Sequence, residues 1–130
     1  MYSATLMEHF TNPRNVGPMD EPDVVGQAGA PGQGPFMVLH LATDDDHIVD
    51  AKFQTYGCGP AIAAGSLLTE LIMSRSCAEC ARLSAGDIVD GLGGMPEEKM
   101  HCAQLAVDAL RNALAGWRPS QAGGAAASDP

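Results

Sequence analysis

The stretch PFMVLHLATDDDHIVDAKFQTYG, residues 35–57, sets the main expectation for the fold. Apolar and polar residues alternate on both sides of an acidic DDDH segment, which is the period-two pattern of strands with one buried face. In the second half, Val49, Ala51 and Phe53 share one face, and Asp50, Lys52 and Gln54 share the other. The pattern predicts an antiparallel hairpin that turns at DDDH and is covered on one side.

The residues before this hairpin predict one helix and then a long loop. SATLMEHF, residues 3–10, begins with a serine suited to a helix N-cap, and Pro13 stops the helical pattern that follows. Residues 18–35 are rich in glycine and proline and lack periodicity, apart from a short candidate strand near Val24 and Val25.

The residues after the hairpin predict helices. PAIAAGSLLTELIMS, from Pro60 onward, has a proline suited to the first helical position and an apolar stripe behind it. Residues 77–92 predict one or two short helices, and residues 96–117 predict a long amphipathic helix. Strands early and helices late favour an α+β fold, with helices packed on one side of a small antiparallel sheet.

Composition limits the classes of function. A chain of 130 residues suits one domain, which we place at 1–117, with an Ala/Gly-rich tail at 118–130 expected to be disordered. The net charge of -9 opposes binding to nucleic acid or to anionic lipid and favours a basic protein partner. No signal-peptide or membrane-span pattern is present, so we expect a cytoplasmic protein whose four cysteines are thiols or ligands.

Two short stretches carry the residues with chemistry. Cys58 lies in YGCGP, between a predicted strand and a predicted helix, whose unpaired N–H groups favour a thiolate. PEEKMHCAQ, residues 96–104, places His101 directly before Cys102. Successive helical side chains point about 100° apart, so these two converge on one atom only near a helix start. Each stretch also has an interpretation without chemistry. Cys58 is then a small residue in a tight turn, and Cys102 is a packed cysteine beside an exposed His101.

Both stretches resemble those of a known family. FQTYGCGPAIAAGSLLTE, GLGGMPEEKMHCAQLAVDAL and the opening YSATLMEHFTNPRNVG are similar to signatures of NifU/IscU-type iron–sulfur cluster assembly scaffolds, and PEEKMHC resembles the NifU-like branch especially. The resemblance runs from Tyr2 to about Trp117. It implies an α+β fold with a three-stranded antiparallel sheet, and a cluster site built from loop tips at one end.

The resemblance also implies site residues. Carried over residue by residue, it assigns Cys58, His101 and Cys102 as ligands of iron or a [2Fe–2S] cluster. It makes Cys102 the acceptor of sulfur from a cysteine desulfurase and Lys99 an accessory residue beside the site. It further implies iron–sulfur acceptor proteins as partners, while a larger complex or a homodimer stays open.

The chain departs from the family in the loop GAPGQGPFMVL. Scaffolds of the family carry Cys-Gly-Asp there, whereas Gln33 stands at the cysteine position and Pro35 at the aspartate position. Glutamine offers a weak neutral carbonyl oxygen and proline offers no donor. A [2Fe–2S] cluster needs four ligands, so one more must come from outside. Three ligands of Cys₂His type also suit zinc with an open fourth position.

A second cysteine pair is a weaker signal. Cys77 and Cys80 form a C-x-x-C in SCAEC, which we interpret as incidental packing, with a second metal or redox site as the alternative. His9 and His40 lie on periodic segments and are interpreted as structural or exposed.

The resulting expectation is a scaffold-like protein of iron–sulfur cluster assembly, not an enzyme, with a depleted ligand set. The alternative is a structural or adaptor subunit that keeps the fold and holds zinc or no metal. A zinc-dependent enzyme ranks last, because no general base is evident near the three ligands.

Overall fold

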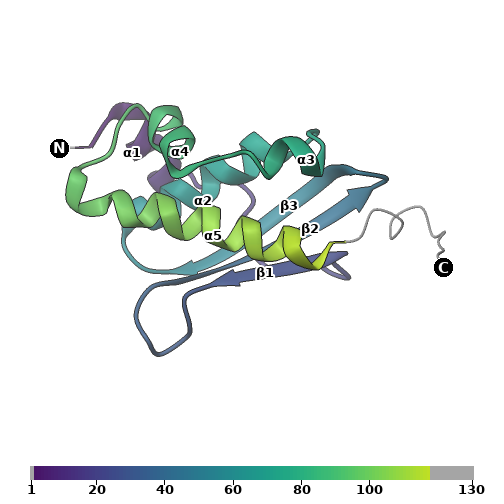
Figure 1. The fold of residues 1–130 in the computed structure, drawn as a ribbon. Coiled ribbons are helices and arrows are strands. Elements are labelled where there is room, and N and C mark those ends of the chain that lie inside the picture. The colour runs from purple at the N-terminus through teal and green to yellow at the C-terminus, as the bar shows by residue number, and fades with distance from the viewer. Residues whose placement is uncertain (1, 118–130) are drawn as a thin grey trace.

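A computed structural model describes residues 2–117, and the predicted disordered tail at 118–130 lies outside the described residues. The elements are α1 (Ala4–Thr11), β1 (Val24–Ala28), β2 (Phe36–Asp44), β3 (His47–Tyr56), α2 (Gly59–Ile72), α3 (Cys77–Cys80), α4 (Ala85–Gly91), the 3-10 helix η1 (Glu97–Lys99) and α5 (Met100–Gly116). The strands form one antiparallel sheet in the order β1-β2-β3, and the helices lie on one side of it (Figure 1). The predicted α+β architecture is confirmed.

The core lies between the sheet and the two long helices, α2 and α5. Met37, Leu39 and Leu41 alternate along β2 and are fully buried. The closest approach is at Gly26 of β1, where an added Cβ would lie 2.2 Å from the carbonyl oxygen of Ala109 in α5. Only glycine lets the backbones come this close. The helix that carries His101 and Cys102 is thereby held against β1 at Ala109 and Ala113.

One face assignment in the hairpin was wrong. Val49 was predicted to share the buried face of Ala51 and Phe53, but it is 54% exposed, whereas Ile48 is fully buried. The cause is a shift in register between β2 and β3, which leaves Val49 without an opposite residue. Such a bulge interrupts the alternation of faces, so the residues on its two sides do not follow one period-two pattern.

Both outer edges of the sheet have backbone groups that other parts of the chain hold. At the β3 edge, the N–H of Phe53 donates to the carbonyl oxygen of Asn15, and Gly17 N–H donates back to the Phe53 carbonyl, each at 2.9 Å. At the β1 edge, the N–H of Gln27 donates to Oδ1 of Asn112 in α5, also at 2.9 Å. The backbone groups tied in this way are held by the chain itself.

Helix α1 is attached to α2 by buried polar groups. His9 is 6% exposed, and its Nδ1 lies 2.7 Å from Oγ of Ser66, which also accepts the backbone N–H of Arg14. The Glu70 carboxylate lies 3.5 Å from His9 Nε2. Burial lowers the pKa of His9, while Glu70 acts in the opposite direction. The prediction that His9 is structural agrees with these contacts.

Among residues 2–117, no helix combines the length and the apolar character that crossing a bilayer requires.

Candidate metal and sulfur site

Cys58 stands at the junction of β3 and α2. Its backbone is extended, and it is the N-cap of α2. This helix begins at Gly59, so Pro60 occupies the second helical position, whereas it was predicted at the first. The Cys58 carbonyl oxygen accepts the N–H groups of Ala61 and Ile62. The side chain makes no capping hydrogen bond and is half-buried. The thiol is therefore held at the helix start but is not used to build it.

His101 and Cys102 occupy the first turn of α5, as the sequence argument required. Helix α5 begins at Met100, directly after η1, so the two side chains lie where the backbone has just entered the helix. Cys102 is 1% exposed, whereas His101 is exposed. The pair thus consists of one covered sulfur and one accessible imidazole.

The structure brings these residues together across the chain. Sγ of Cys58 lies 3.4 Å from Sγ of Cys102, and Nε2 of His101 lies 3.6 Å from the same Cys102 sulfur. The three donors are neighbours but are not held as a finished set. Within residues 2–117, no group of three or more His, Cys, Asp or Glu side chains is arranged to hold a metal ion. Convergence on one ion requires the side chains to rotate.

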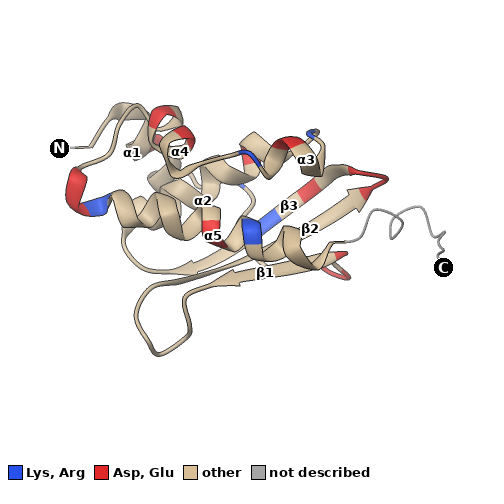
Figure 2. Cartoon of the chain, viewed as in Figure 1, with Lys and Arg blue, Asp and Glu red and all other residues tan. Residues whose placement is uncertain are grey.

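The electrostatics of the site follow from burial. Burial raises the pKa of the Cys102 thiol well above its ordinary value, the neighbouring Cys58 sulfur raises it further, and Lys99 acts in the opposite direction. Lys99 lies in η1 beside two glutamates, and Figure 2 shows this small basic spot next to acidic residues at the tip of the molecule. Metal binding to Cys102 must release its proton, since the thiolate is the ligand.

The loop that carries Gln33 and Pro35, and that differs from the family pattern, lies next to these residues. Pro35 borders a hollow of about 320 Å³ together with His101, Gln104, Leu105 and Asp108. Its Cβ also lies 3.6 Å from the point where a Cβ on Gly57 would be. Gln33 is exposed, and its N–H donates to the carbonyl oxygen of Ala30. The loop therefore runs past the site without placing an anionic ligand in it.

Phe10 is a neighbour of the site that sequence reasoning missed. It was predicted only as part of a helical pattern, but its ring packs where a Cβ on Gly59 would lie, at 3.1–3.2 Å. The ring remains 37% exposed beside the residue that follows Cys58. Helical spacing places Phe10 on α1 but does not say which helix it meets, so no signal in the sequence identifies this contact.

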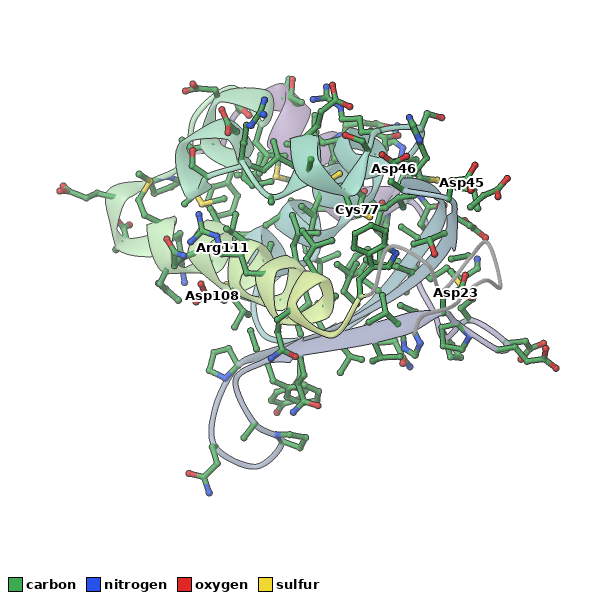
Figure 3. All side chains as sticks on the ribbon, turned by 45° about the vertical axis from the view of Figure 1, so that its right-hand side comes forward. Asp23, Asp45, Asp46, Cys77, Asp108 and Arg111 are labelled. Atoms are coloured by element: carbon green, nitrogen blue, oxygen red, sulfur yellow. The ribbon has the colours of Figure 1, made fainter. Side chains whose placement is uncertain are left out.

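Cys77 and Cys80 lie at the opposite end of the molecule. The N–H of Cys77 donates to the carbonyl oxygen of Asp46 at the β2–β3 turn, and Figure 3 shows the two residues side by side. Cys77 also borders a hollow with Leu114 and Trp117, at the far end of α5 from His101. Leu114 follows Cys102 by 12 residues in α5, so the two ends that the cysteine pairs mark are about 18 Å apart along this helix. The prediction that this pair lies away from the site is confirmed.

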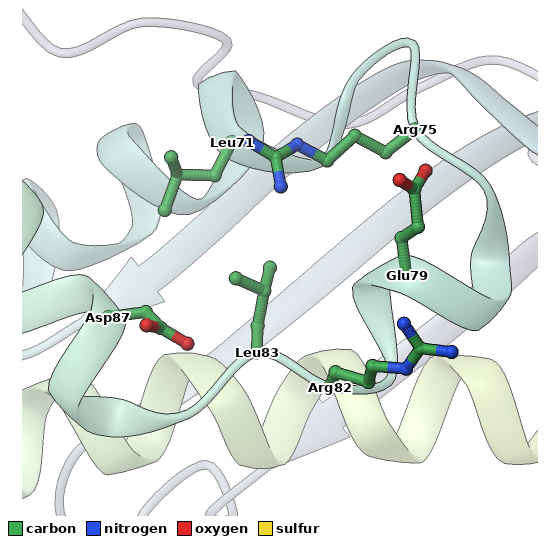
Figure 4. A pocket seen from close by; sticks show the side chains of 6 residues that line it. All are labelled: Leu71, Arg75, Glu79, Arg82, Leu83 and Asp87. Carbon is green, nitrogen blue, oxygen red and sulfur yellow. The ribbon is translucent and has the colours of Figure 1, made fainter.

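A larger hollow of about 430 Å³ lies between α2, α3 and α4 and is lined by Leu71, Arg75, Glu79, Arg82, Leu83 and Asp87 (Figure 4). It contains neither cysteine nor histidine. Its two carboxylates each close a capping box, Glu79 with Ser76 and Asp87 with Ser84. The hollow is a surface dent between short helices, and the thiol chemistry is elsewhere.

Comparison with known proteins identifies the family that the chain resembles. Residues 1–122 match the family described as NifU-like N terminal domain. The chain is 43% identical over 114 residues to the iron–sulfur cluster assembly scaffold protein IscU 1 of Archaeoglobus fulgidus, covering 88% of this chain and 74% of the relative. It is 41% identical over 121 residues to the scaffold protein IscU of Escherichia coli, covering 90% and 94%.

Solved structures show the same fold. A SUF-system scaffold from Fervidobacterium islandicum, described as putative, superposes with a TM-score of 0.72 at 21% identity, covering 87% of this chain and 96% of that one. The N-terminal part of a NifU-like protein from Brucella abortus gives 0.67 at 18% identity, covering 95% of both. At these identities, the superpositions show the fold alone.

Proposed function

The chain belongs to the family of NifU-like N-terminal domains, and from that premise we propose that it is a scaffold for iron–sulfur cluster assembly. The observation that carries the proposal is the 3.4 Å approach of the Cys58 and Cys102 sulfurs, with His101 beside them. Iron and sulfide are the cargo of such a protein. Binding and release are its task, and its relatives are described as scaffold proteins, although one from Drosophila melanogaster has "enzyme" in its name.

Each site residue has a proposed role. Cys102 accepts sulfur from a cysteine desulfurase, Cys58 is the second thiolate and His101 is the nitrogen ligand. Lys99 provides the nearby positive charge, which opposes the effect of burial on Cys102. Because Cys102 is only 1% exposed, a sulfur donor must first displace the side chains that cover it. Opening of the α5 start is therefore part of the proposed cycle.

The depleted ligand set limits what the isolated chain holds. With Gln33 and Pro35 at the two positions that a scaffold loop uses for ligands, three donors remain. Cys₂His suits one tetrahedral zinc with an open position, while a [2Fe–2S] cluster lacks a full set. The fourth ligand then has to come from an acceptor protein, the desulfurase or a second copy. Four free cysteines suit a reducing compartment, so we place this activity in the cytoplasm.

Metal titration of anaerobically purified protein tests the proposal. We expect one zinc or cobalt ion per chain, bound at least ~100-fold more weakly after Cys58→Ser, Cys102→Ser or His101→Ala, because loss of a direct ligand exceeds the usual effect of its outer-shell partners. Cys77→Ser is the matched control and should bind as the wild type does. Equal affinity in the Cys58→Ser and wild-type proteins would contradict the assignment of the site.

Reconstitution tests the ligand count. With iron, sulfide and a desulfurase, the isolated monomer should hold little stable [2Fe–2S] cluster, measured by visible absorption and by acid-labile sulfide. A full and stable complement on monomeric protein would show that Gln33 and Pro35 do not deplete the site.

A further inference from the structure

The two sulfurs of the site are close enough for a reaction other than metal binding. Cys58 and Cys102 are 44 residues apart in the chain, and both thiols are free at an Sγ–Sγ distance of 3.4 Å. A disulfide requires about 2.05 Å, so a closure of about 1.4 Å joins them. Cys58 stands between two glycines and makes no side-chain capping bond that would oppose this movement.

We propose that Cys58 and Cys102 form a redox modification site, in which hydrogen peroxide oxidises Cys58 and Cys102 then closes a disulfide with it. In the first step, the Cys58 thiolate attacks one peroxide oxygen, the O–O bond breaks, and hydroxide leaves and takes up the thiol proton as water. In the second step, the Cys102 sulfur attacks the Cys58 sulfenic acid, the S–O bond breaks, and a second water leaves. Two thiols are oxidised to one disulfide, and one peroxide is reduced to two waters.

The order of the two steps follows from exposure. Cys58 is half-buried at a helix start, whereas Cys102 is 1% exposed. A dissolved oxidant therefore meets Cys58 first, and the sulfenic acid then forms in contact with the covered thiol. An accessible cysteine beside a resolving cysteine is the arrangement that redox-sensitive pairs use.

The other cysteine pair does not offer this reaction. Cys77 is 4% exposed and Cys80 is fully buried, so neither meets a dissolved peroxide. The Cys80 thiol is directed to the carbonyl oxygen of Ile72 at 3.7 Å. Although C-x-x-C is the spacing usually associated with redox chemistry, the structure assigns that chemistry to the pair that is distant in sequence.

The consequence for function rests on the proposed scaffold role. The disulfide would consume both thiolates of the site, so the oxidised protein should bind no metal and accept no sulfur. A thiol reductant should restore both. The cross-link would also tie the start of α2 to the start of α5, which restricts the unfolded chain and makes the oxidised protein harder to unfold.

The test uses the full chain, reduced and metal-free, treated anaerobically with hydrogen peroxide at equal molar amount and then alkylated in denaturant, so that the buried thiols also react unless they are joined in a disulfide. We expect two of the four thiols to resist alkylation, and a peptide containing Cys58 to be joined to one containing Cys102. Cys102→Ser should stop at a sulfenic acid on Cys58, which dimedone captures. Cys102→Ala, checked by circular dichroism, covers the case in which serine disturbs the fold. Cys77→Ser should behave as the wild type.

The outcomes separate this proposal from the scaffold role. A Cys77–Cys80 disulfide, links only between chains, or four alkylated thiols would overturn the redox site while leaving the metal titration untouched. A second outcome combines two results: the wild-type protein forms the Cys58–Cys102 link, and Cys58→Ser binds metal as tightly as the wild type does. That combination would support the redox site and contradict the assignment of Cys58 as a metal ligand of a scaffold.

Discussion

The two cysteine pairs at the ends of α5 have opposite relations between sequence and space. Cys77 and Cys80 are neighbours in sequence, lie in the same short helix and are buried in the core. Cys58 and Cys102 come from separate elements, yet their sulfurs lie 3.4 Å apart at an end of the molecule formed by turns. Burial raises the pKa of both the Cys80 and the Cys102 thiol, so the pairs differ in that Cys58 is half-buried, whereas Cys77 and Cys80 are both buried. Cys77 is also the first residue of α3, so the comparison teaches that exposure and the meeting of separate elements distinguish the two pairs, whereas spacing and position at a helix start do not.

The largest expected effect comes from restoring the two missing ligands beside Cys58 and Cys102, which only this cysteine pair should respond to. The double change Gln33→Cys with Pro35→Asp should produce a coloured cluster on reconstitution, because it returns a thiolate and a carboxylate to the loop beside His101. Loss of Pro35 also frees a fixed backbone angle, so some rearrangement of the loop is expected. Adding Cys58→Ser or Cys102→Ser should remove the colour, and adding Cys80→Ser should not. A folded but colourless double variant would mean that the loop no longer faces the site.

The second prediction disturbs both pairs through the helix they share. Gly26→Ala drives a methyl group into the Ala109 carbonyl of α5, and should lower the free energy of unfolding by about 3 kcal/mol. Urea unfolding measures it. Gly86→Ala is the control, since its Cβ would meet only Ser84 Oγ at 3.5 Å, and should be neutral or stabilising. Equal stability of the two variants would argue against the close contact of β1 with α5.

The third prediction reverses the roles of the two pairs. Cys80→Ser should lower the free energy of unfolding by about 1–3 kcal/mol, because it leaves a buried hydroxyl without a well-placed partner. Cys58→Ser should change it by less than about 0.5 kcal/mol, because its side chain is only half-buried. The loss of metal affinity should rank in the opposite order, large for Cys58→Ser and absent for Cys80→Ser. Urea denaturation and metal titration of both variants measure these two quantities. Similar losses in stability would contradict the distinction between Cys80 as a packing residue and Cys58 as a ligand.

The smallest expected effect concerns pH. His9 has a folded pKa below its ordinary value near 6.5, so the unfolded chain binds a proton that the folded chain resists. Stability is therefore present above that value and is lost as pH falls from about 7 through the folded pKa. Because His9 anchors the helix that carries Phe10, amide exchange in α1 should rise more than in α3, after correction for intrinsic rates. His9→Asn should flatten the response, and an unchanged response would exclude His9 as its source.

Much of the fold was predictable because burial repeats with the period of each element. The alternation in residues 36–44 and the helix signals at Ser3 and Pro60 gave the correct elements. The face of Val49 was not predictable, because a bulge depends on how two strands pair and leaves no local signature. The start of α2 differed from its prediction by one residue, since glycine can also occupy the first helical position.

The three residues named for the site lie close together, while their roles as ligands and sulfur acceptor stay a prediction. Family resemblance named Cys58, His101 and Cys102, and the chain brings them together. It did not indicate that Cys102 would be covered while His101 stays exposed, because that depends on the tilt of α5 against the sheet. The contact of Phe10 with the backbone after Cys58 was missed for the same reason, since it joins two helices that the sequence places independently.

The backbone groups held at the edges of the sheet affect how readily another chain can pair with this protein. An open strand edge is a template on which another chain can add, and small sheets are prone to such growth. Here residues 15–17 occupy the β3 edge at Phe53, and Asn112 holds the backbone of Gln27 on the β1 edge. Under the proposed function, the start of α5 opens, and the contact at Asn112 lies about three turns further along the helix, so the Gln27 backbone can stay paired while that opening takes place.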